Sequence, residues 1–344
     1  MQKELRVRTP LLTPSGNLEQ IGWSPRVLLD CNLEDAHFYA FKPLQGLRIK
    51  RWDYYAIFTP RHFFSATIAD LGYAANIFVY IMDFHTGELY EEGLISPFGL
   101  GASLPRNSTV GISSYTGQGA SLTFTVKDGI HSLDVDWPKF NEGRGISARI
   151  DLKHPSDHES MNLVIPIPPK RFYFNRKINC LPASGFIKYG DLNIKLQPED
   201  SLGQLDWGRG VWEYNSFWNW ASASGFQADG QRIGLNLGTG FGDTGAATEN
   251  AVIVDGKIHK LDQVPFLYNP KDYMQTWIFK DSEGRLNLTF TPFKDRTART
   301  NLGIIFSEVH QLFGRYNGHV ILNNGDRLNI RDLIGFAEEH HARW

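Results

Sequence analysis

The stretch Leu122-Thr123-Phe124-Thr125-Val126 alternates apolar and small polar side chains, and Asp128-Gly129 separates it from a second run, Ile130 to Trp137. Alternation with a period of two is typical of a β-strand that buries one face. Asp-Gly between two such runs indicates a hairpin, because both central residues of the favoured turn need positive φ. This stretch therefore predicts an antiparallel β-hairpin.

The same pattern recurs along the chain, whereas helical patterns are scarce. Turn signals between apolar runs occur at His85–Glu88, Asp229–Gly230, Asp255–Gly256, Asp281–Gly284 and Asn323–Asp326. Successive hairpins form meanders, and closing a meander into a barrel or sandwich removes its exposed edges. The sequence therefore predicts an all-β protein of antiparallel meanders.

The length of the chain predicts two domains. Its 344 residues exceed one ordinary core and favour two domains of about 170 residues each. The segment Ile165-Pro166-Ile167-Pro168-Pro169-Lys170 is the predicted boundary, because proline lacks the N–H group that strand pairing needs. We expect an N-terminal barrel or sandwich over residues 1–168 and a C-terminal barrel with the main site over residues 169–344.

Composition excludes several classes of partner. The formal net charge is −2, from 35 Lys and Arg against 37 Asp and Glu, so no basic excess exists to neutralise nucleic-acid phosphates. The segment Gly240–Gly245 spells G-x-G-x-x-G, but it precedes a predicted strand rather than the helix that a dinucleotide site needs. We expect neither a nucleic-acid partner nor a nucleotide cofactor.

The location of the protein is predicted from its N-terminus, its cysteines and its apolar runs. Residues Met1 to Arg8 are charged and resemble no signal peptide. Cys31 and Cys180 lie far apart without a motif, as in a reducing compartment. No apolar stretch approaches the roughly 20 residues of a membrane helix. The sequence predicts a cytoplasmic protein without a transmembrane segment.

Four of the nine Trp lie between Leu205 and Trp220, together with one Tyr. On one strand, the period of two places four of these aromatic residues on a single face; they are Trp212, Tyr214, Trp218 and Trp220. Such a face is either a dense core layer or the wall of an apolar pocket. Trp207 belongs to the same segment, and we expect it to contribute to the same ligand site.

Asp206 and Arg209 are charged residues within this apolar segment. A carboxylate and a guanidinium in such surroundings must be paired or used. They either contribute to a pocket or form a salt bridge that fixes the beginning of the strand. Glu249 and Asn250, just before the predicted strand 251–254, either face the same cavity or cap a turn.

Two predicted strands repeat the pattern Ile-x-Phe-x-Glu-x-His, and the four polar residues of this pattern are Glu308, His310, Glu338 and His340. The alternation predicts that all four face inward and that Glu339 and His341 face water. Such a cluster would suit general acid–base chemistry. Metal binding is one alternative, and a buried hydrogen-bond network that fixes the strand register is the other.

Several longer motifs together closely resemble the family of domain of unknown function 2804. These motifs are Asp206–Trp212, Trp218–Gly225, Leu235–Gly242, Thr248–Ala251, His310–Gly314 and Gly335–His340. More distantly, the chain is similar to two-domain lipocalin-type proteins, which include carotenoid hydratases and tocopherol cyclases. That resemblance implies two lipocalin-like β-domains around an apolar ligand, and a proton donor that faces an olefin. Asp206, an acidic residue beside Trp207, is most like the donor of these relatives.

The sequence thus predicts a protein that binds an apolar small molecule, such as a lipid, an isoprenoid or a polyketide-like compound. Acid-catalysed hydration, isomerisation or cyclisation would need Asp206, Glu308 or Glu338 as the acid, with a pKa raised by burial. A non-catalytic lipid carrier and a barrel with a filled core are the alternatives. We expect no cofactor and no metal, and the sequence leaves the oligomeric state open.

Overall fold

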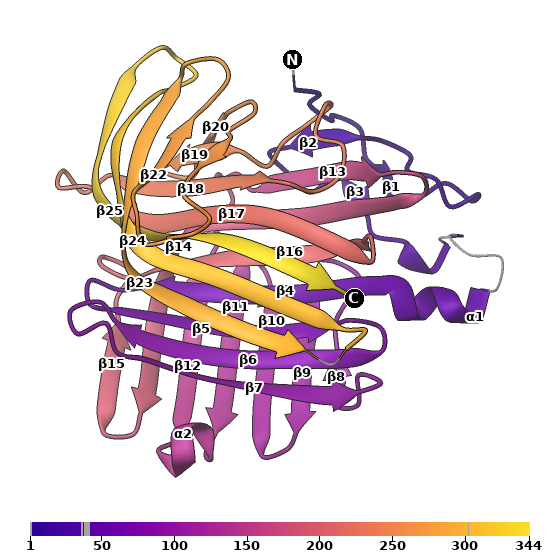
Figure 1. Ribbon diagram of the computed structural model, residues 1–344, viewed down its shortest axis with the longest axis horizontal. Coiled ribbons are helices and arrows are strands. Elements are labelled where there is room, and N and C mark those ends of the chain that lie inside the picture. Colours follow the sequence, from indigo (N-terminus) through magenta and orange to yellow (C-terminus); the bar gives the residue numbers. More distant parts are fainter. Residues whose placement is uncertain (1, 36, 38–41, 302) are drawn as a thin grey trace.

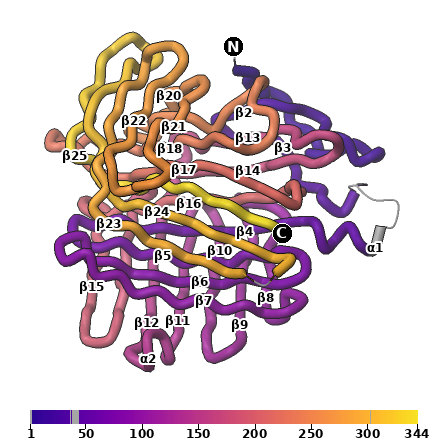
Figure 2. The backbone as a smooth tube through the Cα atoms, in the orientation of Figure 1, coloured from indigo at the N-terminus to yellow at the C-terminus, as the bar shows by residue number. Residues whose placement is uncertain are grey.

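The computed structural model describes residues 2–35, 37, 42–301 and 303–344 (Figure 1). The chain folds into two large curled antiparallel sheets, with only short helical turns between strands. The all-β prediction is confirmed. Figure 2 shows that the C-terminal strands lie directly against the strands of the N-terminal half. Among the described residues, no helix is long and apolar enough to cross a bilayer.

The larger sheet is built from the N-terminal part of the chain. Its main path follows the order β7-β6-β5-β4-β16-β14-β12-β11-β10-β9-β8, with β2, β13 and β15 attached at its side. Its strands are β2 (Gly22–Ser24), β4 (Ile49–Phe58), β5 (His62–Asp70), β6 (Ala74–Asp83), β7 (Leu89–Pro97), β8 (Ala102–Ser103), β9 (Gly111–Gly117), β10 (Ala120–Lys127), β11 (Ile130–Trp137), β12 (Ile146–Lys153), β13 (Met161–Ile167), β14 (Arg171–Tyr189), β15 (Leu192–Leu196) and β16 (Leu202–Val211).

Short elements complete this half of the protein. They are the paired strands β1 (Thr9–Pro10) and β3 (Leu29–Asp30), the helices α1 (Lys42–Gln45) and α2 (Phe140–Gly143), and the 3-10 turns η1 (Leu33–Asp35) and η2 (Gly46–Arg48). Figure 1 shows β5–β7 crossing in front of β9–β12, so the sheet folds over on itself. A large apolar core, which includes Tyr55, Phe124 and Trp207, fills the space inside.

The smaller sheet has the order β20-β19-β18-β17-β25-β24-β23-β22-β21. Its strands are β17 (Asn215–Phe226), β18 (Arg232–Thr239), β19 (Ala251–Val254), β20 (Lys257–Lys260), β21 (Phe266–Leu267), β22 (Trp277–Lys280), β23 (Leu286–Asn301), β24 (Phe306–Ile321) and β25 (Arg327–Arg343). One face of this sheet curls around its own apolar core, which includes Trp277, Phe290 and Tyr316. The predicted Asp-Gly turns at Asp128 and Asp255 both have positive φ and both close hairpins.

The sheets divide between Val211 and Asn215 rather than at the proline-rich segment. Strand β13 contains Pro166 and pairs with β14, which continues the larger sheet after the cis peptide bond Pro168-Pro169. Strand β14 pairs with β13 and β16 in its first part and with β12 and β15 in its second, and its pairing with β16 contains a bulge between Ile178 and Leu181. The division into domains at residue 168 stays a prediction.

An aromatic layer joins the two sheets. Rings from β4–β6 of the larger sheet contact rings from β17, β24 and β25 of the smaller sheet; examples are Phe63 against Phe313 and Tyr54 against Trp220, with ring centroids 4.8 and 5.6 Å apart. Asn179 on β14 adds polar contacts, since its Nδ2 donates to Ser222 Oγ (3.0 Å) and Ala223 O (3.1 Å) on β17. The space between the sheets is therefore buried but not wholly apolar.

Asn179→Ala should destabilise this contact between the sheets. The variant removes Asn179 Nδ2, the donor to Ser222 Oγ and to the Ala223 carbonyl, from a buried layer. This loss should lower the free energy of unfolding by about 2 kcal/mol. Urea denaturation measures the change, and the exposed Asn193→Ala on β15 is the matched control, with an expected change below about 0.5 kcal/mol. Equal effects of the two substitutions would show that Asn179 does not join the sheets.

Candidate functional site

The candidate site is a polar cluster between the two sheets. Lys177 Nζ on β14 lies 3.1 Å from Asp206 Oδ2 on β16 and 3.4 Å from Glu249 Oε2, in the segment before β19. Asn175 Nδ2 donates to the same Glu249 oxygen (2.8 Å). All four side chains are buried. Because buried charges need partners, Lys177 is what allows both carboxylates to lie here.

This cluster has two electrostatic features. Burial raises the pKa of Glu249; Lys177 opposes that shift and the neighbouring Asp206 adds to it. Asp206 Oδ1 is buried and has no hydrogen-bond partner among the described residues, although Oδ2 contacts Lys177. An unpaired carboxylate oxygen in such a place is costly, and it can accept a hydrogen bond from a ligand.

Glu338 on β25 lies in the same layer. Its carboxylate accepts hydrogen bonds from Trp218 Nε1 (3.2 Å) and Gln311 Nε2 (3.0 Å). Burial raises the pKa of Glu338 to about 7, with a further rise from Asp206, whereas the Trp218 hydrogen bond and the charges of Arg296 and Lys177 lower it. Near neutral pH this carboxyl therefore exists in both protonation states, as general acid–base chemistry requires.

A chain of hydrogen bonds connects Glu338 to the larger sheet. Gln311 Oε1 accepts from Tyr80 Oη (2.8 Å), and Tyr80 Oη lies 2.9 Å from Tyr54 Oη. The Arg296 guanidinium lies over the Tyr80 ring, 4.2 Å from its centroid, and pairs with Glu91. These contacts fix the orientation of Gln311, which in turn fixes the Glu338 carboxyl.

Aromatic rings cover this polar layer. Trp212 follows β16 and Trp218 lies on β17, so they face each other from the two sheets with centroids 5.6 Å apart. Rings packed against Trp212 include Trp52, Tyr173, Phe241 and Trp344. Trp218, Trp52 and Trp344 are only partly buried. The wall therefore leads from the surface towards Glu338.

His340 lies behind Trp218, with the two ring centroids 4.0 Å apart. Its Nε2 lies 2.8 Å from Ser307 Oγ. Burial lowers the pKa of His340 to about 3, and the nearby Arg296 and His341 charges lower it further, so this imidazole is neutral at pH 7. His340 therefore supports the Trp218 ring rather than carrying a charge.

The sequence predicts that one strand face carries Trp212, Tyr214, Trp218 and Trp220. In the structure these four residues do not share a face. Residues 212–214 lie between β16 and β17, so the chain changes sheet within this segment. Tyr214 is exposed and donates to Ile304 O. Lys177 Nζ occupies one face of Trp220, 3.9 Å from the ring centroid. Of these four, Trp212 and Trp218 pack against each other and form the aromatic wall.

Trp207 and Arg209 point away from the candidate site. Alternation along β16 turns Asp206 towards the smaller sheet and Trp207 and Arg209 into the core of the larger one. Asn250 also lies apart from the Lys177 cluster, because its side chain joins Gly238 N and Asp262 O. Asn250 thereby fixes the loop that presents Glu249.

The predicted four-residue Glu and His cluster does not form. Strands β24 and β25 pair Gln311 with Glu338 and His310 with Glu339, so Gln311, not His310, shares the face of Glu338. Glu308 and His310 are partly exposed on the other face, near Arg299 and Asp295 respectively. The predicted water-facing position of Glu339 is also wrong.

Glu339 is buried because β25 has a core on each side. The inner face of the smaller sheet surrounds its carboxylate with Tyr273 Oη (2.7 Å), Tyr268 Oη and His341 Nε2 (2.8 Å). No group of three metal-ligating side chains forms within the described part of the chain. Lys177, Asn175, Gln311 and Tyr80 were missed by the sequence analysis, because each reaches the site only through strand pairing and no local motif marks it.

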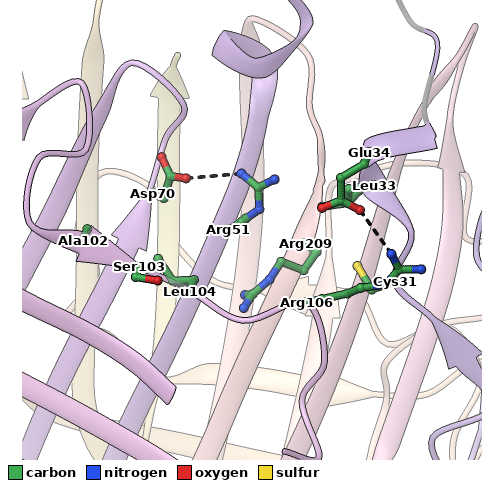
Figure 3. A pocket seen from close by; sticks show the side chains of 10 residues that line it. All are labelled: Cys31, Leu33, Glu34, Arg51, Asp70, Ala102, Ser103, Leu104, Arg106 and Arg209. Atoms are coloured by element: carbon green, nitrogen blue, oxygen red, sulfur yellow. Dashed lines mark hydrogen bonds and ion pairs between the residues drawn. The ribbon is translucent and has the colours of Figure 1, made fainter. Parts of the chain in front are cut away.

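Two cavities among the described residues lie elsewhere. One of about 170 Å³ is lined by Arg51, Arg106 and Arg209 among others (Figure 3), and one of about 490 Å³ lies near Tyr90 and Tyr189. Neither is lined by Trp212, Trp218 or Glu338.

Comparison with known proteins agrees with this fold. The model of a domain of unknown function, DUF2804, matches residues 2–344. The chain belongs to the DUF2804 family. This confirms the predicted family, while a search of curated proteins gave no match for the chain.

Solved structures share the architecture of this DUF2804 protein at low sequence identity. CghA with Sch210972 aligns with a TM-score of 0.56 and 11% identity over 86% of this chain and 88% of CghA. A putative AttH from Nitrosomonas europaea aligns with a TM-score of 0.52 and 13% identity over 85% and 92% of the two chains. These similarities establish the fold alone.

The raised pKa of Glu338 should make the stability of the DUF2804 protein depend on pH. The glutamate of the unfolded chain loses its proton near pH 4.5, whereas Glu338 in the folded chain keeps it to about pH 7. Between these values the folded state binds more protons, so the free energy of unfolding falls as pH rises. The fall is on the order of 3 kcal/mol.

Denaturant unfolding of the wild type and Glu338→Gln across this pH range measures the effect. The variant cannot ionise at position 338 and should lack that decrease, whereas Glu308→Gln, at a partly exposed position on β24, should retain it. Parallel pH profiles for the wild type and Glu338→Gln would contradict the assigned pKa.

Proposed function

We propose that this protein binds an apolar small molecule between its two sheets and that Glu338 transfers a proton to it. The observation that carries the proposal is a buried carboxyl with a pKa of about 7 directly beneath Trp218. A carboxylic acid that keeps its proton near neutral pH can protonate a carbon–carbon double bond and thereby start hydration, isomerisation or cyclisation.

The aromatic wall supports an apolar ligand. Ligand sites are mostly apolar with a few well-placed polar groups, and here Trp212, Trp218 and Trp344 stand over a small set of carboxyl and amide groups. Their π faces stabilise positive charge, which develops when an olefin is protonated. Trp220 contributes less to this effect, because Lys177 already occupies one of its faces.

Asp206 complements Glu338 in this proposal. Its Oδ2 is held by Lys177, and its unpaired Oδ1 is an acceptor for a proton or for a water molecule that adds to the substrate. Glu338 would then be the acid and Asp206 the base, each fixed by a different sheet. The structure of CghA with Sch210972 supports the view that this fold accommodates a ligand.

A lipid carrier is the second candidate, because both Glu338 oxygens already have protein donors and therefore need no substrate to satisfy them. A carrier would use the same wall without chemistry. A cytoplasmic location stays a prediction in either case.

Organic extraction of the purified protein, followed by mass spectrometry, tests the ligand site. The wild type should release one apolar compound at close to one molecule per chain. Trp218→Ala should release about tenfold less, because part of the wall is lost. Phe98→Ala, which removes a ring that is 81% exposed in the turn after β7, is the control and should match the wild type. Equal yields from all three proteins would place the ligand elsewhere.

Incubation of the recovered compound in D₂O tests the proton transfer. Protonation at carbon leaves a C–D bond whether hydration, isomerisation or cyclisation follows, so deuterium uptake measures the shared step. Glu338→Gln should slow it by about 100-fold or more, whereas Glu308→Gln, the same substitution outside the cluster, should not. Full deuterium uptake with Glu338→Gln would show that Glu338 is not the acid. If the wild type and both variants bind the compound without deuterium uptake, the carrier function is favoured.

A further inference from the structure

A second polar site lies in the larger sheet, away from the proposed ligand site. Its cavity of about 170 Å³ is lined by three arginines from distant parts of the sequence: Arg51 on β4, Arg106 in the loop after β8, and Arg209 on β16. Figure 3 shows these three side chains, with Asp70 paired to Arg51 and Glu34 paired to Arg106. Three guanidinium groups at one cavity are suited to an anion.

Arg209 is held rigidly at this cavity. Its Nη1 donates to Asp53 Oδ1 (2.9 Å) and Trp52 O (2.8 Å), and its Nη2 donates to Pro105 O (3.1 Å). The remaining Nε is buried and has no partner among the described residues, in a side chain that is 1% exposed. A fixed, unpaired charged donor beside a cavity is a built hydrogen-bonding position for a ligand.

The other two arginines leave capacity for a ligand. Arg51 Nη1 donates to Asp70 Oδ2 (3.2 Å), and its Nη2 and Nε have no hydrogen-bond acceptor among the described residues. Arg106 pairs with Asp30 and Glu34, whose side chains are 50% and 64% exposed. Water screens such exposed carboxylates, so they neutralise the cavity only weakly.

The thiol of Cys31, which also lines the cavity, is sensitive to the local field. Burial raises the pKa of Cys31 to about 12. The charges of Arg209, Arg51 and Arg106 act in the opposite direction. Each arginine is also paired with a carboxylate, Arg209 with Asp53, Arg51 with Asp70, and Arg106 with Asp30 and Glu34, so a ligand would be held by the donors that these pairs leave unused.

The rest of the lining defines the kind of anion. Leu33, Leu104 and Ala102 are the apolar residues of the lining. A cavity of about 150 Å³ holds a benzene ring, and planar carboxylates match the fork geometry of guanidinium groups. We infer that this cavity binds a small organic carboxylate, with the carboxylate between Arg51 and Arg209 and its apolar body against Leu33 and Leu104.

Calorimetric titration of the full chain with benzoate tests this site. Benzoate should bind saturably, whereas benzamide, its uncharged counterpart, and inorganic phosphate, which lacks the apolar body, should each bind at least tenfold more weakly. Arg51→Met should lower the affinity for benzoate at least tenfold. Arg149→Met, at an exposed arginine that pairs with Asp134 on the same sheet, is the matched control and should bind like the wild type.

Arg51→Lys covers the case in which Arg51→Met fails to fold, because lysine keeps the positive charge but lacks the planar guanidinium group. This variant should weaken benzoate binding by a smaller factor than Arg51→Met. Four results would overturn the proposal: no saturable benzoate binding, equal affinity for benzamide, tighter binding of phosphate, or equal affinity in Arg51→Met and Arg149→Met.

Discussion

The structure depends on one constraint, which is that charged groups buried between two sheets must be paired. Lys177 lies between Asp206 and Glu249, so one ammonium group compensates two carboxylates that water cannot reach. The three residues come from β14, β16 and the segment before β19, and so their contact fixes how the sheets dock. The aromatic layer beside them supplies apolar burial, but polar pairing defines the position.

Strand β25 shows how this constraint produces chemistry. It is buried on both faces, and it presents Glu338 to the space between the sheets and Glu339 to the core of the smaller sheet. Burial disfavours ionisation of both carboxyls. At Glu339 the hydrogen bonds from Tyr268, Tyr273 and His341 outweigh burial and lower the pKa, whereas at Glu338 burial prevails and the pKa rises to about 7. Two adjacent glutamates therefore differ in protonation because their faces differ.

The sequence predicts the strands well and the site only in part. The Asp-Gly turns and alternating runs indicate the hairpins, because these signals are local. Glu338 is also identified from alternation. Glu338 pairs with Gln311 instead of His310 because of the strand register, which the alternation pattern does not fix. Glu339 is buried because a second apolar core covers the other face of β25, and the sequence of a single strand does not show that core. Lys177 has no motif, so only the fold brings it to Asp206.

The most direct test of the account is the ionisation of Glu338 itself. NMR of protein with ¹³C-labelled glutamate carboxyls follows each group through a pH titration, and the signal missing from Glu338→Gln identifies position 338. The account predicts a midpoint near pH 7 for that signal. A midpoint near the ordinary glutamate value of about 4.5 would show that Glu338 is ionised at neutral pH, and would contradict its assignment as the acid.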